Sequence, residues 1–316
     1  MPTLKVALLG ANGNVGGPIL SQLLSSPSNH SVTVLHRPSS TSPLPSHPNL
    51  NPVPLPSSPT ISSLTPLLKD HDAVIIAIPL TNLDLHLDLA SAAAAAGVKH
   101  YMPADFGSVD SAAPLSQKLV PLFGRKSAVR QRLTDLARQH EGTGFTWTAL
   151  VNGHFFDWAL KTNFMHFDLR AKKALVLGDG EQRMSLSTLG RVAEATVRVL
   201  EMGAEGREEV RGRTLMVQSF CVTQWEVLRA LEGATRGKWE VEREGVEGFV
   251  RREEGRRDEG SKEAVEELVF ALGVMEGDWT RREEFAMGLL GLEDEDLGEV
   301  VGRVVREMEA EEKGDR

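Results

Sequence analysis

Cysteine, tyrosine, N-terminal acids and long apolar runs are all scarce in this 316-residue chain. Its one cysteine, Cys221, excludes an internal disulfide, which is typical of proteins from a reducing compartment. No apolar run reaches the roughly 18 residues of a membrane span. The start, MPTLKVALLG, enters a strand pattern without the segments of a signal peptide, so we expect a cytoplasmic protein with no membrane partner.

Acidic residues are unevenly distributed. No Asp or Glu precedes Asp70, although the formal net charge of the whole chain is -9. The negative total argues against a nucleic-acid partner. An acid-free N-terminal segment suits a ligand that carries phosphates, but Ser- and Pro-rich composition explains the same shortage without a ligand.

Strand and helix patterns alternate in the first half of the chain. Lys5–Leu9 is a short apolar run, a helical pattern follows over Pro18–Leu24, and Ser31–Leu35 alternates as a second strand. The alternation continues with strands expected at Ala73–Ile78, Val98–Met102 and Phe145–Val151 and helices at Leu87–Ala96 and Lys126–Arg138. This order predicts an α/β fold with a Rossmann-type, doubly wound parallel sheet.

Three glycines lie in GANGNVG, directly after the first strand and before the first helix. Gly10 permits a tight turn, Gly13 lets the backbone approach a pyrophosphate, and Gly16 lets the helix pack close to the strand. The first amides of that helix would then face the phosphates. We expect the cofactor to contact Gly10, Asn12, Gly13, Asn14, Val15 and Gly16. A glycine turn that only packs is the alternative.

The end of the second strand favours NADPH over NADH. It reads Leu35-His36-Arg37, with none of the acids that hold the ribose hydroxyls of NAD. The guanidinium of Arg37 can hold a 2′-phosphate through paired hydrogen bonds, and His36 and Ser39 could add contacts. An ordinary surface arginine is the alternative.

The pattern loosens after residue 151. We expect an NADP-binding Rossmann domain over residues 1–151 and a smaller, mainly substrate-binding region over 152–316, with some strands returning to the first sheet. Residues 39–66 are predicted to be mostly extended loop with a weak strand near Asn51–Leu55. Residues 240–258 are predicted to form a solvated helix or a mobile loop. In the second half we expect helices at Leu186–Met202, Gln224–Thr235 and from Lys262, and a strand at Thr214–Gln218.

Five segments together resemble one family: GANGNVG, LHR after the second strand, AAAAAGVKHYMPADFG, GRKSAVRQRL and NGHFFDW. The family is the NmrA-like, isoflavone reductase-like branch of the atypical short-chain dehydrogenases, particularly its fungal members. Its PSEFG pattern stands here as Pro103-Ala104-Asp105-Phe106-Gly107, with Asp in place of Glu and Ala in place of Ser. The classical Tyr–Lys pair is absent, because the single tyrosine, Tyr101, is followed four residues later by an aspartate.

The resemblance implies a catalytic lysine at the start of a helix, four residues before an arginine. Lys126 and Arg130 fit that motif. Beside a nicotinamide and an apolar wall, such a lysine loses hydration and its pKa should fall, so it could exchange a proton with the substrate. We expect Lys126 to be the general acid/base and to contact the cofactor together with Pro79 and Phe106. Without the resemblance, a solvated surface lysine would be the ordinary explanation.

The segment after residue 151 offers candidate substrate contacts. His154 could hydrogen-bond a substrate oxygen, although a histidine satisfied in the core fits the sequence equally well. An aromatic-rich stretch suits either an aromatic pocket or hydrophobic core, and it contains Phe155, Phe156, Trp158, Phe164 and Phe167. His154 and His166 lack the spacing of a metal site, so we expect no metal.

These features predict an NADPH-dependent reductase of a small aromatic or conjugated substrate, with Lys126 as acid/base. The alternative is a non-catalytic NADP(H)-sensing regulatory protein of the NmrA type, since a fold does not fix a function. The sequence leaves open whether the protein forms a homodimer.

Overall fold

The computed structural model describes residues 3–314, which fall into two compact units. Each unit draws on separate stretches of the chain: unit 1 comprises Met1–Phe106, Leu122–Leu150 and Val192–Leu215, and unit 2 comprises Gly107–Pro121, Val151–Arg191 and Met216–Arg316. Among residues 3–314, no helix has both the length and the apolar character that crossing a membrane requires.

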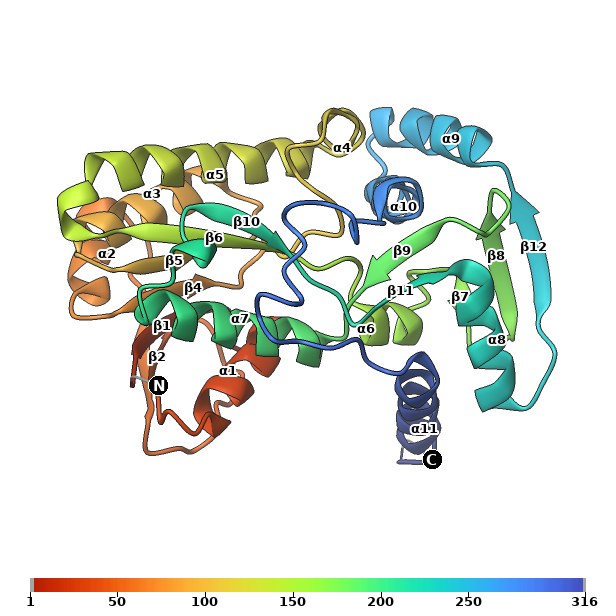
Figure 1. Ribbon diagram of the computed structural model, residues 1–316, viewed down its shortest axis with the longest axis horizontal. Helices are drawn as coiled ribbons and strands as arrows, with labels where there is room; N and C mark the ends of the chain where they lie inside the picture. Colours follow the sequence, from red (N-terminus) through yellow and green to blue (C-terminus); the bar gives the residue numbers. More distant parts are fainter. Residues whose placement is uncertain (1–2, 315–316) are drawn as a thin grey trace. The chain divides into compact units, whose positions relative to one another are not determined.

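Unit 1 is built around a seven-stranded sheet (Figure 1). Its strands lie in the order β10 (Arg213–Met216), β6 (Thr146–Val151), β5 (His100–Met102), β4 (Ala73–Ile76), β1 (Lys5–Leu9), β2 (Ser31–His36) and β3 (Leu50–Pro54). All neighbouring pairs from β3 to β6 are parallel. The chain builds outward from β1 in both directions, so the predicted doubly wound, Rossmann-type fold is confirmed.

Helices cover both faces of this sheet. One face carries α2 (Ile61–Leu68), α3 (Leu83–Ala95) and α5 (Pro121–Gln139), and the other carries α1 (Gly16–Ser25) and α7 (Leu189–Ala204) (Figure 1). Two short 3-10 helices, Glu141–Thr143 and Glu208–Val210, lie in connections. Because both faces are covered, all four residues of β4 are buried, as its apolar sequence predicts.

Helix α2 corrects the expectation of an extended loop over residues 39–66. The Thr60 side chain accepts a hydrogen bond from the Ser63 amide, and the Ser63 hydroxyl accepts one from the Thr60 amide. This capping box starts the helix, which buries Leu64 and Leu68. Serine replaces the usual Glu or Gln of the motif, and Pro66 lies inside the helix, so the sequence signal is weak.

Helix α5 begins at Pro121 rather than at Lys126, where the sequence placed its start. Proline suits a first helical position, because its missing N–H has no partner to lose there. Lys126 therefore lies in the second turn of the helix and not at its beginning.

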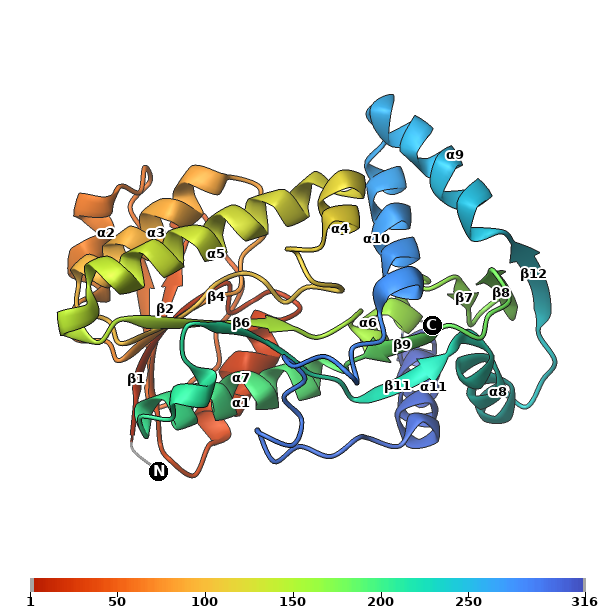
Figure 2. The ribbon, with the colours of Figure 1, turned by 45° about the horizontal axis from the view of Figure 1, so that its top comes forward.

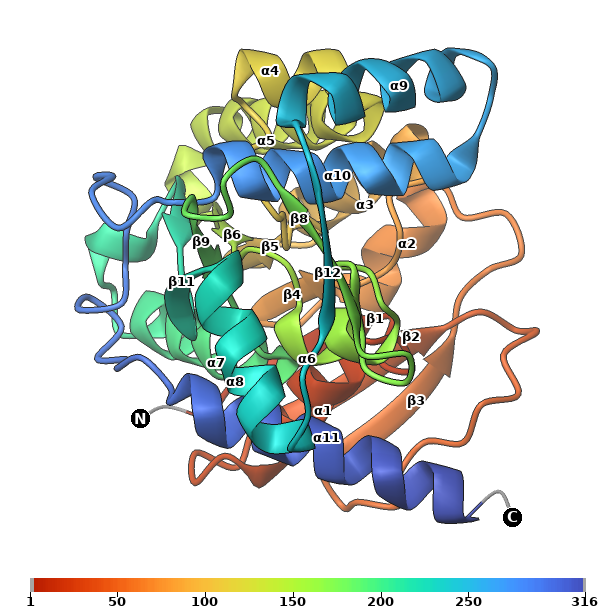
Figure 3. The same ribbon diagram turned by 90° about the vertical axis from the view of Figure 1, so that its right-hand side faces the viewer.

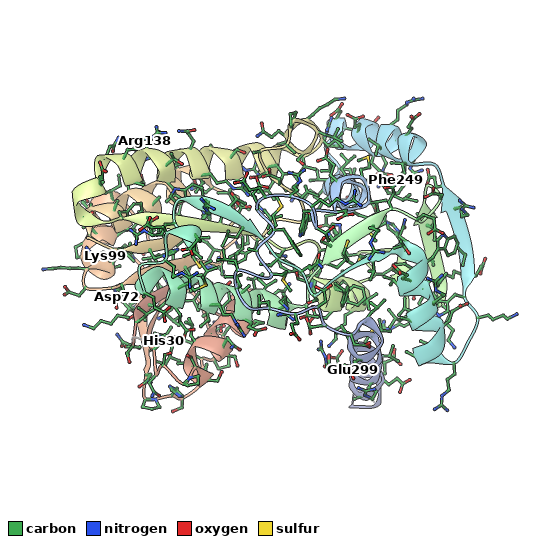
Figure 4. All side chains as sticks on the ribbon, viewed as in Figure 1. His30, Asp72, Lys99, Arg138, Phe249 and Glu299 are labelled. Atoms are coloured by element: carbon green, nitrogen blue, oxygen red, sulfur yellow. The ribbon has the colours of Figure 1, made fainter. Side chains whose placement is uncertain are left out.

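The amino ends of the strands in unit 1 are tied together by buried polar groups. His30, labelled in Figure 4 at the start of β2, accepts a hydrogen bond from the Leu4 amide at Nδ1 (3.2 Å). Its Nε2 lies 3.1 Å from Oε1 of Glu201 on α7, and that oxygen also accepts from Ser26 and Ser28. These contacts fix α7 and the α1–β2 connection at this edge of the sheet.

Unit 2 combines two small sheets with helices. Strands β9 (Arg183–Leu186) and β11 (Phe220–Thr223) pair antiparallel, and β7 (Phe167–Asp168), β8 (Lys173–Leu177) and β12 (Glu240–Glu244) form the second sheet. The helices are α4 (Pro114–Leu119), α6 (Phe156–Lys161), α8 (Gln224–Thr235), α9 (Val246–Asp258), α10 (Lys262–Glu276) and α11 (Leu297–Gly314). Figure 2 shows α9 and α10 joined as a hairpin, and Figure 3 shows α8 beside α11.

The charged segment 240–258 is more ordered than its composition predicts. It forms the edge strand β12, which was not expected, and then α9, a largely solvated helix as expected, in which only Phe249 and Glu253 are buried. Phe249, labelled in Figure 4, is buried against Phe270 of α10, with ring centroids 6.3 Å apart. The buried carboxylate of Glu253 pairs with Arg252 and Arg256 at 2.8 Å each. One apolar anchor and paired charges therefore order the segment.

Candidate functional site

Four loops of unit 1 leave the parallel sheet at a common edge. The strand register pairs Leu9 with both Leu35 and Ile76, and it pairs Ile75 with Met102. The segments that follow β1, β2, β4 and β5 therefore start side by side at the carboxyl ends of the strands. Doubly wound sheets bind their ligands at this edge.

The glycine turn after β1 leaves no room for a Cβ at Gly10 or Gly16. Gly10 has a φ of +93°, and a Cβ there would overlap the carbonyl of Ala77. A Cβ on Gly16 would overlap the carbonyl of Gly10, and one on Gly13 would lie 3.3 Å from the Gly10 oxygen. That oxygen also accepts the Gly13 amide at 2.9 Å. The three glycines thus let the turn, α1 and the segment after β4 pack closely.

Several backbone amides at the start of α1 are free to donate hydrogen bonds. The amides of Asn14, Val15 and Gly16 donate no hydrogen bond to any residue between 3 and 314, and no side chain caps the helix. Asn12 and Asn14 are exposed, and Val15 is half-buried. First-turn amides with the positive end of a helix dipole behind them can bind an anion.

The end of β2 presents a cation beside this turn. Arg37 and Ser39 are exposed and His36 is half-buried, with Nδ1 of His36 3.1 Å from the carbonyl oxygen of Arg37. The Ser40 amide donates to the same carbonyl at 2.9 Å, which turns the chain directly after the strand. The Arg37 side chain is therefore available to a phosphate.

Lys126 is buried on α5, with 9% of its surface exposed. Its Nζ donates to the backbone oxygen of Asp105 and lies 5.6 Å from the centre of the Phe123 ring. Burial lowers the pKa of Lys126; the neighbouring Asp105 charge raises it, and Arg130 lowers it further. The lysine thus has a perturbed proton affinity at the ligand-binding edge, which is typical of functional groups.

The loop after β5 is held by α5 at two points. Lys126 binds the carbonyl of Asp105, and Nε of Arg130 binds its carboxylate through Oδ2. Oδ1 of Asp105 is buried and has no hydrogen-bond partner among residues 3–314. Phe106 follows with a φ of +35° and is half-buried. Asp105, which replaces the glutamate of the motif, therefore anchors this loop.

A narrow pocket adjoins Lys126, and its interior is too tight to hold a water molecule in this structure. Its lining is Leu80, His86, Pro103, Ala104, Asp105, Lys126 and Val129, all from unit 1. The sequence pattern indicates Lys126 as a site residue but not His86. His86 is the one basic side chain in the apolar and acidic sequence of α3, LDLHLDLASAAAA, and that contrast was the available signal.

A family model described as NAD(P)H-binding matches residues 10–201, more than half of the chain. The chain belongs to the NAD(P)H-binding family. The oxidoreductase poxI of Penicillium oxalicum is 28% identical over 314 residues, which cover 96% of this chain and 94% of the relative. The oxidoreductase aprR of Aspergillus flavus is 30% identical over 240 residues, covering 76% and 77% respectively. The family and these relatives make the protein an NAD(P)H-dependent oxidoreductase.

Solved structures share the fold of this NAD(P)H-binding protein. A structure described as AtPrR2 with NADP+ and (+)pinoresinol has a TM-score of 0.74 and 20% identity, and the match covers 96% of this chain and 99% of that one. An isoflavone reductase has a TM-score of 0.72 and 19% identity, with coverage of 95% and 99%. The fold that the resemblance to the isoflavone reductase-like branch implies is confirmed.

The candidate substrate residues of this NAD(P)H-binding protein lie in unit 2. Phe156 is fully buried and packs edge-on against Phe220, with ring centroids 4.8 Å apart. Phe155 is half-buried at the start of α6. Of the other aromatic residues in the stretch, Phe167 is in the core, and Trp158 and Phe164 pack against it. The stretch therefore builds much of the core of unit 2.

His154 is buried beside α10. Its ring packs edge-on against Phe164 at 5.2 Å, and it lies so close to Gly273 that a Cβ there would overlap Nε2. Nε2 has no hydrogen-bond partner among residues 3–314. Burial lowers the pKa of His154 to about 4. The side chain is therefore neutral at physiological pH.

Within residues 3–314, no three His, Cys, Asp or Glu side chains are placed to hold a metal ion.

We expect acid to destabilise the protein through His154. The unfolded chain protonates this histidine near its ordinary pKa of 6.5, whereas the folded protein resists protonation until about pH 4. The contribution of neutral His154 to the free energy of unfolding is thus complete above pH 6.5 and is lost as the pH falls toward 4. Between pH 7 and 5 the loss is on the order of 2 kcal/mol. Urea unfolding across this range should show a shallower pH dependence for His154→Gln. The control His140→Gln should follow the wild type, and parallel curves for wild type and His154→Gln would contradict the expectation.

Proposed function

We propose that this protein is an NADPH-dependent reductase of a small aromatic or conjugated substrate, with Lys126 as the general acid/base. The observation that carries the proposal is the burial of the Lys126 ammonium in a pocket at the carboxyl edge of the sheet. Burying an ammonium costs free energy, because its hydrogen bonds to water are lost. The hydrogen bond from Lys126 to the Asp105 carbonyl replaces only part of them. A dinucleotide sensor has no need of such a group, which favours an enzyme over a sensor.

The residues at the sheet edge fit a dinucleotide with a 2′-phosphate. The close packing of the turn excludes a Cβ at Gly10 and Gly16, and the amides at the start of α1 are available to a pyrophosphate. Asn12, Asn14 and Val15 belong to the same turn. Arg37, with His36 and Ser39 beside it, would hold the 2′-phosphate.

Lys126 would exchange the proton in the proposed reaction. The bound nicotinamide supplies a hydride. Protonated Lys126 would give its Nζ proton to the substrate oxygen on which negative charge develops, and its lowered pKa makes that transfer easier than from an ordinary lysine. Pro79 and Phe106, in the loops that flank the pocket, would contact the cofactor. The apolar lining, including Leu80 and Val129, would limit access of water.

The aromatic substrate class is inferred from similar structures. One of them is described with (+)pinoresinol, and another is an isoflavone reductase. His154, Phe155 and Phe156 are the proposed substrate contacts of unit 2; Phe155 is half-buried, whereas His154 and Phe156 are buried. The proposal is tested by NADPH consumption with a panel of aromatic enones and benzylic ethers. Tight NADPH binding without turnover of any of them, together with a co-purifying protein partner, would favour the sensor.

Replacing Arg37 with alanine should weaken NADPH binding about 10- to 100-fold and leave NADH binding unchanged. Only NADPH carries the 2′-phosphate, and a charge-assisted hydrogen bond is worth about 1.5–3 kcal/mol. Calorimetric titration with each nucleotide measures the two affinities. The matched control is Lys69→Ala, which removes an exposed cation from the end of α2. Equal losses for the two nucleotides in Arg37→Ala would show that Arg37 does not read the phosphate.

A further inference from the structure

The loop after β4 lies between the glycine turn and the Lys126 pocket. The residues that lead into it, Ala77 and Ile78, pack against Gly10, whose added Cβ would lie 3.1 Å from Cγ2 of Ile78. Leu80, three residues after Ala77, is buried and lines the Lys126 pocket. The loop therefore touches both the proposed cofactor cradle and the proposed acid/base.

Side chains from two helices hold the carbonyls of this loop. Nε of Arg125 on α5 donates to the Leu80 oxygen at 3.2 Å. Nε2 of His86 on α3 lies 3.3 Å from the Pro79 oxygen. A carbonyl oxygen can only accept, so Nε2 of His86 carries the proton in this contact. The Thr81 amide donates to the same Pro79 oxygen at 2.9 Å.

These contacts replace backbone hydrogen bonds that the loop after β4 does not make. Pro79 has no amide hydrogen to donate, and β4 ends at Ile76, after which the Ala77 amide still donates to the Leu9 oxygen of β1 at 2.8 Å. Three consecutive residues are thus restrained by one backbone and two side-chain hydrogen bonds. Each donor belongs to a different part of unit 1, namely the loop itself, α3 and α5.

Arg125 and Lys126 are neighbours on α5 and bind different loops. Arg125 donates to the loop after β4, and Lys126 donates to the Asp105 carbonyl in the loop after β5. One turn of α5 therefore sets the position of both loops relative to the lysine ammonium. A helix that only packed on the sheet would not link the loop after β4 to the loop after β5 in this way.

We propose that Arg125 and His86 are positioning residues that hold the Pro79–Thr81 turn in the shape the nicotinamide end of the cofactor requires. The inference rests on the proposed cofactor site. Neither residue takes part in proton transfer. Without either restraint, the turn is open in part of the molecules before the cofactor binds. Only the molecules with a closed turn bind the cofactor, so the apparent affinity falls in proportion to their fraction.

The test compares Arg125→Met with two matched variants. Arg125→Lys keeps a donor, and Arg132→Met removes a second α5 arginine that donates to Ser91 of α3 at 3.1 and 3.3 Å but does not touch the turn. We expect Arg125→Met to raise the Kd for NADPH about 5- to 20-fold. We expect Arg125→Lys to restore most of the affinity and Arg132→Met to leave it unchanged. His86→Leu should reproduce the loss and serves if Arg125→Met does not fold.

A measurement without cofactor separates this inference from the proposed function. Amide hydrogen exchange of the peptide spanning residues 77–83 should speed up at least about tenfold in Arg125→Met and not in Arg132→Met. Faster exchange in a protein that binds no NADPH would support the restraint and refute the proposed cofactor. Unchanged exchange in both Arg125→Met and His86→Leu overturns the inference. So does an affinity loss in Arg132→Met equal to that in Arg125→Met, because general destabilisation then explains both.

Discussion

Lys126→Ala should lower kcat for NADPH-dependent reduction about 10²- to 10⁴-fold and leave the NADPH affinity within a few-fold of wild type. The ammonium binds the Asp105 carbonyl in the free protein, so its loss removes one contact of a loop that Arg130 also holds. Steady-state kinetics with the best substrate of the aromatic panel give kcat, and calorimetry gives the affinity. Lys69→Ala, an exposed lysine of the same unit, is the matched control.

The pH dependence of the same pair of proteins gives a second readout. Lys126 donates a proton only while it is protonated, so the wild-type rate should fall as the pH rises through its pKa. Burial places that pKa below the 10.5 of an ordinary lysine, so the alkaline limb should appear below pH 10.5 and vanish in Lys126→Ala. A variant that keeps both kcat and the alkaline limb would remove Lys126 from the chemistry.

Gly16→Ala should abolish measurable NADPH binding and destabilise the protein by about 1–3 kcal/mol. The added Cβ would overlap the carbonyl of Gly10, and this backbone atom cannot swing aside as a flexible side chain would. The start of α1 must therefore move away from β1, and the amides of Asn14 and Val15 move with it. Calorimetry and urea unfolding measure the two effects.

Gly17→Ala is the matched control for Gly16→Ala. It adds the same methyl group to the next residue of α1, where the Cβ meets only the Ala11 oxygen at an ordinary 3.5 Å. Alanine is also a better helix former than glycine, so Gly17→Ala should be neutral or stabilising by up to about 1 kcal/mol. If Gly16→Ala binds NADPH as tightly as Gly17→Ala does, the turn is not the cofactor cradle.

The sequence predicts the nucleotide half of the fold well because its strands are buried on both faces. Strand β1 matches its expected bounds, and β2 and β6 differ from theirs by one residue; in unit 2, helix α8 also matches. Apolar runs bounded by glycines can be recognised from neighbouring residues alone, without knowledge of the tertiary structure. Helix α2 escaped prediction because a serine capping box and an internal proline resemble a loop. In unit 2, the two-residue strand β7 is too brief to show a period.

The candidate site was predicted in part. The glycine turn, Arg37 and Lys126 each follow a recognisable strand end or motif, and the structure brings the loops after β1, β2, β4 and β5 to one edge. His86 and Arg125 were not predicted, because their partners are backbone carbonyls 7 and 45 residues away in the chain. A contact to a carbonyl imposes no requirement on the identity of the accepting residue and leaves no trace in the sequence.

The three-segment composition of unit 1 has a consequence for the order of events during synthesis. Most of helix α7 and of β10, the last strand of the sheet, lies within Val192–Leu215, after a stretch that belongs to unit 2. A ribosome adds about 5–20 residues per second, so the first 150 residues wait several seconds for their last strand. Until then the edge of β6 is unpaired and Glu201 has not reached His30. In this interval the nascent chain can misassociate through the unpaired edge of β6, and a protein cut at residue 151 would keep that edge unpaired permanently.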